Sequence, residues 1–103
     1  MIGPVTGSAG EYTAIGFIGR PDTQIFGEPS ADLTTGISGF ILLDGAAIGL
    51  ATSAMIDRNG TAYPSGVEPD TLVESDVASI MDPTDPVAAA AAEWLLQQPS
   101  CTA

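Results

Sequence analysis

The sequence contains no histidine and no lysine, and its only basic side chains are Arg20 and Arg58 among 103 residues. Aspartate and glutamate together number 13, which gives a formal net charge of −11 at pH 7. Nucleic-acid binding needs cationic side chains that neutralise phosphates, and an anionic membrane surface repels a chain of this charge. The composition therefore excludes nucleic-acid partners and anionic lipid surfaces, and we attribute the acidic excess to solubility.

Cysteine and long apolar runs are also scarce. Cys101 is the single cysteine, so no internal disulfide can form. No apolar run approaches the roughly 18 residues that a membrane span requires, and the first residues have neither the basic nor the hydrophobic part of an export signal. We therefore expect no membrane insertion and no targeting signal in this chain.

Apolar residues are plentiful by contrast. Hydrophobic side chains make up 45% of the sequence and charged ones 15%, a balance that favours a packed core over disorder. The length fits one domain. The carboxylates are scattered, with no histidine partners and no EF-hand spacing, so we expect neither a metal nor an organic cofactor.

The first half of the chain reads as strand, turn, helix, strand and loop. Residues 2–5 form a short apolar strand, which Pro4 assigns to a strand end or an edge. Helical spacing from residue 9 to residue 19 predicts a helix that ends at glycine and proline. A strand is expected at 23–26, and the segment 28–39, rich in small residues, is expected to be an ordered surface loop suited to binding.

The middle of the chain predicts a β-hairpin. Strands are expected at 39–43 and 46–56, joined by a two-residue turn at Asp44-Gly45. Apolar residues occupy both alternating faces of the second strand, which predicts a strand covered on both sides.

Two further signals follow toward the C-terminus. Asn59-Gly60 indicates a second hairpin turn; with Thr61 it also matches a glycosylation sequon, but a tight turn explains the same residues more simply. The alanine-rich segment 87–98 predicts a helix, with Asp85 as its cap and Pro86 at its first position.

Ser8, in the stretch "TGSAGE", raises the main functional question. Ser8 and Glu11 have the spacing of a capping box, and this structural role is the one that the residues alone favour. A serine at a helix N-terminus is also placed where backbone N–H groups, such as that of Ala9, can stabilise an oxyanion. Thr6 breaks the G-x-S-x-G pattern of α/β-hydrolases, and without lysine the segment is no phosphate-binding loop.

Four segments together resemble the tail-specific, or C-terminal-processing, serine proteases, closest in character to the nisin-resistance type. They are "TGSAGE", "GRPDTQIFGEPSADLTTG", "DRNGTAYPSGVEPD" and "DPVAAAAAEWL". The resemblance implies that Ser8 is the acyl-forming nucleophile and that the Ala9 N–H is an oxyanion donor. It implies an α/β fold, a partial crotonase- or Clp-like ββα spiral with β-hairpins and a C-terminal helix. Residues 1–98 would be the C-terminal half of a catalytic domain, with 99–103 a frayed tail.

The same resemblance implies a peptide or protein substrate and a bacterial, extracytoplasmic parent protein. By analogy, six residues in two groups would lie near the substrate channel: Gly27, Glu28 and Pro29, and Thr34, Thr35 and Gly36.

The chain lacks the base that such a serine requires. Family members with a Ser/Lys dyad carry the lysine where this sequence has Leu33, and others use a histidine in a part that has no counterpart here. Glu11, taken as an exposed carboxylate, is too acidic for the task. We therefore expect a serine endopeptidase fragment, inactive alone, whose base comes from a missing N-terminal half or another subunit.

Two alternatives remain open at this point, a non-catalytic peptide-binding domain and a structural domain of the same fold. We also expect the isolated chain to self-associate, because residues 2–5 would leave an apolar strand edge unpaired.

Overall fold

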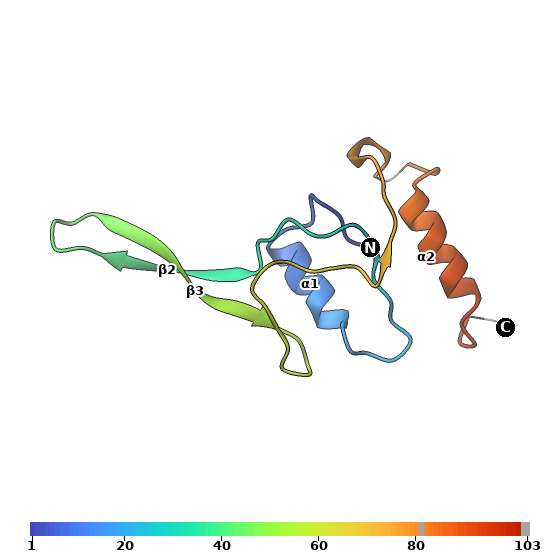
Figure 1. Ribbon diagram of the computed structural model, residues 1–103, viewed down its shortest axis with the longest axis horizontal. Helices are drawn as coiled ribbons and strands as arrows, with labels where there is room; N and C mark the ends of the chain where they lie inside the picture. Colours follow the sequence, from blue (N-terminus) through green and yellow to red (C-terminus); the bar gives the residue numbers. More distant parts are fainter. Residues whose placement is uncertain (81, 102–103) are drawn as a thin grey trace.

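The computed structural model describes residues 1–80 and 82–101, which form a small α/β domain (Figure 1). Within these residues the elements follow one another as α1 (Ala9–Phe17), β1 (Phe26–Gly27), β2 (Thr35–Ile41), β3 (Ala47–Ile56), β4 (Ala62–Tyr63), β5 (Thr71–Leu72), the 3₁₀ helix η1 (Val77–Ser79) and α2 (Pro86–Leu96). A parallel pair joins β1 to β5, and an antiparallel sheet has the order β2-β3-β4. The expected α/β class, β-hairpins and C-terminal helix are confirmed.

The body of the molecule contains the core. The parallel pair aligns Phe26 with Thr71, and Ile2 bridges to Gly27 beside it. The side chains of the core are buried and come from segments far apart in sequence: Ile2, Ile15, Ile25 and Val67. Helix α2 packs on β1 through the rings of Phe26 and Trp94, whose centroids lie 6.0 Å apart.

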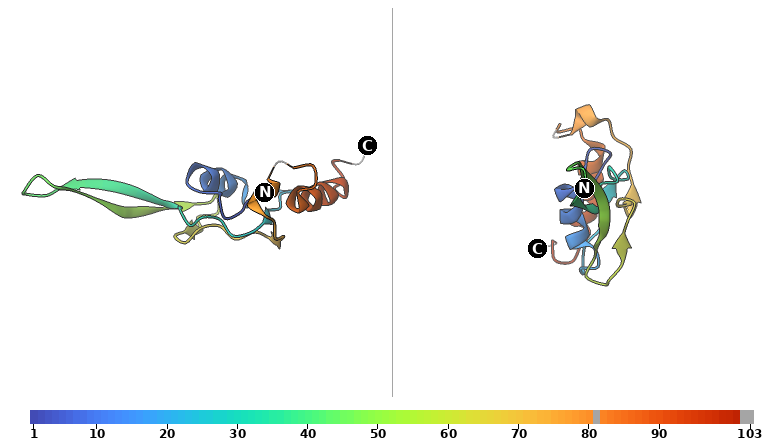
Figure 2. Two further views of the ribbon diagram at one scale, coloured as in Figure 1. Left: turned by 90° about the horizontal axis from the view of Figure 1, so that it is seen from above. Right: turned by 90° about the vertical axis from the view of Figure 1, so that its left-hand side faces the viewer.

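Strands β2 and β3 form a long arm that projects from the body, as the two further views also show (Figure 2). We call the segment 35–56 the arm. It accounts for the longest dimension of the molecule, 64 Å against 33 and 18 Å for the other two axes. Among the described residues β2 pairs with β3 alone, and only the last two residues of β3 pair with β4.

The turn at the tip of the arm has three residues, so the expected two-residue turn is wrong. Leu42 donates its N–H to the Ala46 carbonyl at 2.7 Å, and the Gly45 N–H reaches the Leu42 carbonyl at 2.9 Å. A two-residue turn of type I′ needs positive φ at both central residues, but here only Gly45 has it, at 86°. The wider turn follows from this backbone geometry.

Two other expectations about this region are wrong. Every residue from 47 to 53 is exposed, so β3 is not covered on both sides. The apolar pattern predicts that both faces of β3 are buried, but the arm extends away from the body, so no other layer of the described chain covers them. Likewise, residues 35–39 are not loop but the first part of β2, because β3 is long enough to pair with them.

The boundaries of the first half also shift. Helix α1 ends at Phe17, before the expected 19, since Gly19 has φ 77°. The strand expected at 23–26 contains only Phe26 and continues to Gly27. The expected strand at 2–5 reduces to the bridge at Ile2, whose N–H and carbonyl both pair with the β1 segment. Ile2 is therefore paired on one side.

The later signals are confirmed, although α2 ends at Leu96 and not at 98. Asn59-Gly60 forms the turn between β3 and β4, with Gly60 at φ 84° and its N–H donated to the Asp57 carbonyl. Asp85 caps α2 by accepting the Val87 N–H at 2.9 Å, and Pro86 is the first helical residue. None of the described helices has both the length and the apolar character needed to cross a membrane. Of the expected tail, residues 102 and 103 lie outside the described residues.

Candidate active site around Ser8

Ser8 lies at the N-terminus of α1, on a turn with an uncommon backbone conformation. Its φ of 50° and ψ of −110° fall outside the regions that L-residues favour, and the residue is exposed. Ala9 follows as the first residue of α1, where a backbone N–H has no partner within the helix. The serine therefore stands in a strained position beside the positive end of the helix dipole.

Glu11 is fully buried beneath this turn, so the expectation of an exposed carboxylate is wrong. It accepts the Ser8 N–H at 2.7 Å, which is the glutamate half of the predicted capping box, and also the Ser30 hydroxyl at 2.5 Å and the Leu33 N–H at 3.0 Å. Burial alone raises the pKa of Glu11, but the hydrogen bonds from Ser30, Leu33 and Ser8 outweigh it and hold the pKa below its ordinary value. Glu11 is thus an ionised structural anchor and a poor base.

Ser30 is the residue of this site that the sequence analysis missed. Besides donating to Glu11, its hydroxyl accepts the Val67 N–H at 2.8 Å, and its own N–H donates to the Val67 carbonyl at 3.0 Å. The Ser30 hydroxyl thus links Glu11, in the first turn of α1, to Val67 in the segment before β5. Its partners lie 19 and 37 residues away in sequence, so no local pattern could have pointed to it.

Leu33 lies next to the Ser8 turn. A Cβ placed on Gly7 would lie 3.0 Å from Leu33 Cδ1, and the Leu33 N–H is held by Glu11. The side chain is nevertheless 56% exposed. The position where the family resemblance would place a lysine is therefore adjacent to the segment that carries Ser8, and it presents an apolar group there.

The first group of candidate substrate-binding residues lies beside the core. Gly27 is buried in β1 with φ 127°, Glu28 is half-buried, and Pro29 is exposed. Glu28 accepts the Ser75 N–H at 3.2 Å.

The second group spans the start of the arm. Thr34 is fully buried, and its hydroxyl accepts the Gly66 N–H at 3.0 Å. Thr35 pairs with Ala54 and Gly36 with Ser53 in the β2–β3 ladder. Thr34 to Gly36 thus follow Leu33 directly in the chain, whereas Glu28 contacts Ser75, which follows β5.

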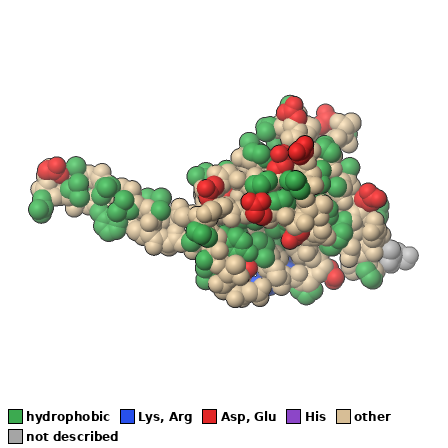
Figure 3. All heavy atoms as spheres, viewed as in Figure 1, with side chains coloured by type: hydrophobic (Ala, Val, Ile, Leu, Met, Phe, Trp, Pro, Cys, Tyr) green, Lys and Arg blue, Asp and Glu red, His purple; other side chains and the backbone are tan. Residues whose placement is uncertain are grey.

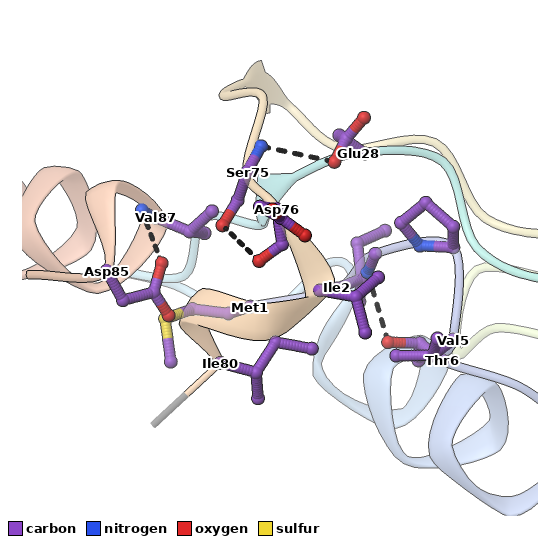
Figure 4. Close-up of a pocket in the computed structure, with 13 residues that line it drawn as sticks. Met1, Ile2, Val5, Thr6, Glu28, Ser75, Asp76, Ile80, Asp85 and Val87 are labelled. Carbon is purple, nitrogen blue, oxygen red and sulfur yellow. Dashed lines mark hydrogen bonds between the residues drawn. The ribbon is translucent and has the colours of Figure 1, made fainter. Parts of the chain in front are cut away.

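A cavity of about 190 Å³ lies beside the segment that leads to Ser8 (Figure 4). Its walls are largely apolar, with three carboxylate residues among them; the lining includes Ile2, Val5, Thr6, Glu28, Val77, Ile80, Asp76, Asp85 and Val87. Neither Ser8 nor Ala9 lines this cavity. It adjoins the candidate nucleophile without containing it.

Both arginines lie at the opposite end of α1 from Ser8. Arg58 donates to the carbonyls of Gly16 and Ile18, at 2.7 and 3.1 Å, and the guanidinium of Arg20 stands 5.3 Å from the centre of the Phe17 ring. In residues 1–80 and 82–101, no three His, Cys, Asp or Glu side chains gather in a group that could hold a metal ion.

Comparison with known proteins gives a likeness to a solved structure. No protein-family model and no curated protein matches the chain. Among solved structures, the chain is similar to a lipoprotein from Streptococcus agalactiae, with 35% sequence identity and a TM-score of 0.54 over 69% of this chain and 25% of that chain. The likeness thus spans about a quarter of the lipoprotein, so it establishes a shared fold region and leaves the family of this chain unassigned.

Proposed function

We propose that this chain carries the nucleophile of a serine endopeptidase core, with Ser8 as the acyl-forming residue and the Ala9 N–H as an oxyanion donor. The observation that carries the proposal is the exposed Ser8 held at φ 50° at the N-terminus of α1. Strained, exposed serines at helix N-termini suit nucleophilic attack, because the hydroxyl is presented to a substrate while nearby N–H groups stabilise the developing charge. The segments that resemble tail-specific proteases support the same assignment.

The base for this reaction comes from outside the sequence in hand. The chain has no histidine and no lysine, and Glu11 is occupied by three hydrogen bonds that lower its pKa. A partner polypeptide, either another part of the parent protein or another subunit, supplies the base. The partial crotonase- or Clp-like spiral belongs to this proposal, and the likeness to a much longer bacterial lipoprotein is compatible with it.

The test uses a fluorophosphonate probe, which reacts with activated serines, and mass spectrometry to locate the adduct. We expect no labelling of the chain alone. Leu33→Lys places an amine beside the Ser8 turn. The neutral fraction of this amine, which is the form that can act as a base, rises between pH 7 and 10, so labelling at Ser8 should increase over that range. Leu33→Met is the matched control, and Ser8→Ala in the Leu33→Lys background should abolish the adduct.

Two results would count against the proposal. Efficient peptide hydrolysis by the unmodified chain alone would show that a base is present within it. The second is that Leu33→Lys forms no Ser8 adduct across that pH range and that mixtures with a histidine-bearing N-terminal half form none either. Ser8 would then have only a structural role at the start of α1. The second candidate function, a non-catalytic domain of the same fold, would then be favoured, since Glu11 already gives the turn a structural purpose.

A further inference from the structure

The arm exposes apolar side chains on both faces and carries almost no charge. The large hydrophobic residues exposed along it are Ile37, Phe40, Ile41, Leu42, Leu43, Ile48, Leu50 and Ile56, with exposures from 40% to 111%. Asp44 at the tip is the only charged residue between Thr35 and Ile56, although the chain holds 13 acidic residues. Figure 3 shows hydrophobic side chains along the arm and acidic ones concentrated on the body.

The outer edge of β2 is open over the whole length of the strand. The sheet order β2-β3-β4 leaves the seven residues of β2 paired on one side only. Exposed edges are ordinarily protected by lysine, proline, an inward charge or a short strand, and β2 has none of these. We propose that this edge pairs antiparallel with β2 of a second copy of the chain, which gives a two-fold symmetric dimer.

The sequence of β2 complements itself in that arrangement. Antiparallel pairing centred on Ser38 sets Ile37 opposite Gly39 of the second copy and Phe40 opposite Gly36. A large side chain across from a glycine covers backbone that would otherwise face water. Gly39 offers the room, because a Cβ placed there meets no atom within 4 Å.

Charge opposes a second copy in any orientation, and this orientation keeps most of the charges apart. Antiparallel pairing separates the two Asp44 side chains by about 40 Å at roughly 3.3 Å per residue, far beyond the screening length of about 8 Å at physiological salt. The acidic bodies lie at opposite ends of the paired arms for the same reason. In this register Asp44 of each copy falls opposite Asp32 of the other, which weakens the contact, but the rest of the arm brings no charge into it.

The size of the contact sets the expected strength. In the same register, Leu43 of the second copy falls opposite the half-exposed Leu33. Each apolar side chain that becomes fully buried removes on the order of 60 to 120 Å² from water. With four such side chains and one strand edge per copy, the interface stays below the ~1,200 Å² of a stable complex, so we expect a dissociation constant on the order of tens of micromolar.

Sedimentation velocity over a wide range of concentrations tests the proposal. We expect a reversible shift from the 10.4 kDa monomer to twice that mass. Gly39→Glu puts a charge opposite Ile37 of the second copy and should weaken the dimer at least about tenfold. Gly16→Glu is the matched control, since it makes the same charge change at another open position, on α1, and should leave the dimer intact. Circular dichroism should show both variants folded.

Cross-linking tests the register. In a Cys101→Ser background, Ser38→Cys should form an intermolecular disulfide under mild oxidation, whereas Ser100→Cys should not. A monomer at every concentration would overturn the proposal, and so would equal weakening by Gly39→Glu and Gly16→Glu. Species that grow beyond the dimer with concentration would overturn the two-fold pairing in favour of open-ended strand addition.

Discussion

At the scale of single residues, Glu11 shows how one side chain organises the candidate site. Its carboxylate gathers the N–H of Ser8, the hydroxyl of Ser30 and the N–H of Leu33, so the helix start and the loop before β2 share one acceptor. The strained backbone at Ser8 persists because the buried Glu11 carboxylate holds the Ser8 N–H in a hydrogen bond. The capping-box spacing predicted the first of these contacts; the other two depend on tertiary folding.

Glu11→Gln should therefore destabilise the fold although it changes few atoms. The amide NH₂ cannot accept a hydrogen bond, so it leaves at least one buried donor unsatisfied, at a cost of about 2 to 3 kcal/mol. Urea unfolding measures the loss. Glu93→Gln, on the exposed side of α2, is the control and should change stability by less than ~0.5 kcal/mol. Equal effects of the two substitutions would contradict the anchoring role of Glu11.

The pH dependence of stability should follow Glu11 and Asp57. The pKa of Asp57 is lowered because its carboxylate accepts the N–H of Thr61 and of Asn59 and the Tyr63 hydroxyl, and these bonds outweigh the effect of burial. For carboxyls whose pKa is lowered by folding, the stabilisation is complete above the unfolded values of about 4 and disappears as the pH falls through the folded values. Melting temperatures should be level from pH 7 to pH 5 and fall steeply below about 4. Glu11→Gln should fall less steeply, and a parallel curve would contradict the assignment.

Gly27 is a position where no other residue fits. With φ at 127°, an added Cβ would overlap the carbonyl oxygen of Ile2, which accepts the N–H of Glu28. Gly27→Ala should separate Ile2 from β1 and lower stability by about 3 kcal/mol or more. Gly3→Ala, where an added Cβ meets no atom within 4 Å, is the control. Thermal melting of both variants, with unchanged behaviour of the control, checks the expectation; a melting point for Gly27→Ala within two degrees of the original would refute it.

At the scale of elements, the C-terminal end of α1 depends on a side chain from the β3–β4 turn. Arg58 donates to the carbonyls of Gly16 and Ile18, which lie where helix carbonyls lack partners of their own. Arg58→Ala should cost about 1 kcal/mol, which corresponds to roughly 4 to 8 °C in a domain of this size. Arg20→Ala removes only the contact with the Phe17 ring and should cost less. Calorimetry distinguishes the two, and a larger loss for Arg20→Ala would be evidence against this role of Arg58.

The elements that sequence reasoning predicted well are those with local signals. Asp85 and Pro86 mark the start of α2, and Asn59-Gly60 marks a turn, because capping and positive φ are decided by a few adjacent residues. Strands β1 and β5 have only two paired residues each, so neither strand is long enough to show a periodic pattern in the sequence. These strands form because segments distant in the sequence pair with them: β5 and Ile2 both pair with β1.

The prediction for the arm is wrong for a physical reason that applies to the candidate site too. Apolar residues on both faces of β3 predict burial, but the pattern does not say which layers supply it, and here the chain supplies none. Similarly, the spacing of Ser8 and Glu11 predicts a cap, while the burial of Glu11 depends on Ser30 and Leu33 from a distant loop. Local geometry was predictable; the environment of each group was not.

At the scale of the whole molecule, a strongly acidic body carries a nearly neutral arm. Among the described residues, both arginines lie in the body, Arg58 on the end of α1 and Arg20 on Phe17, so the arm offers no arginine for an ion pair with a second copy. Association through the arm is then driven by apolar burial and strand pairing and opposed by repulsion between two chains that each carry a net charge of −11.

Salt should therefore strengthen the association. Raising the ionic strength from about 0.01 to 0.15 M shortens the screening length from roughly 30 to 8 Å, which reduces repulsion between the bodies and leaves apolar contacts intact. Sedimentation equilibrium at both salt concentrations should give a tighter dimer at the higher one, with Gly39→Glu monomeric in both. An interface built on ion pairs would respond in the opposite sense, so a dimer that weakens with salt would place the contact on the charged body and not on β2.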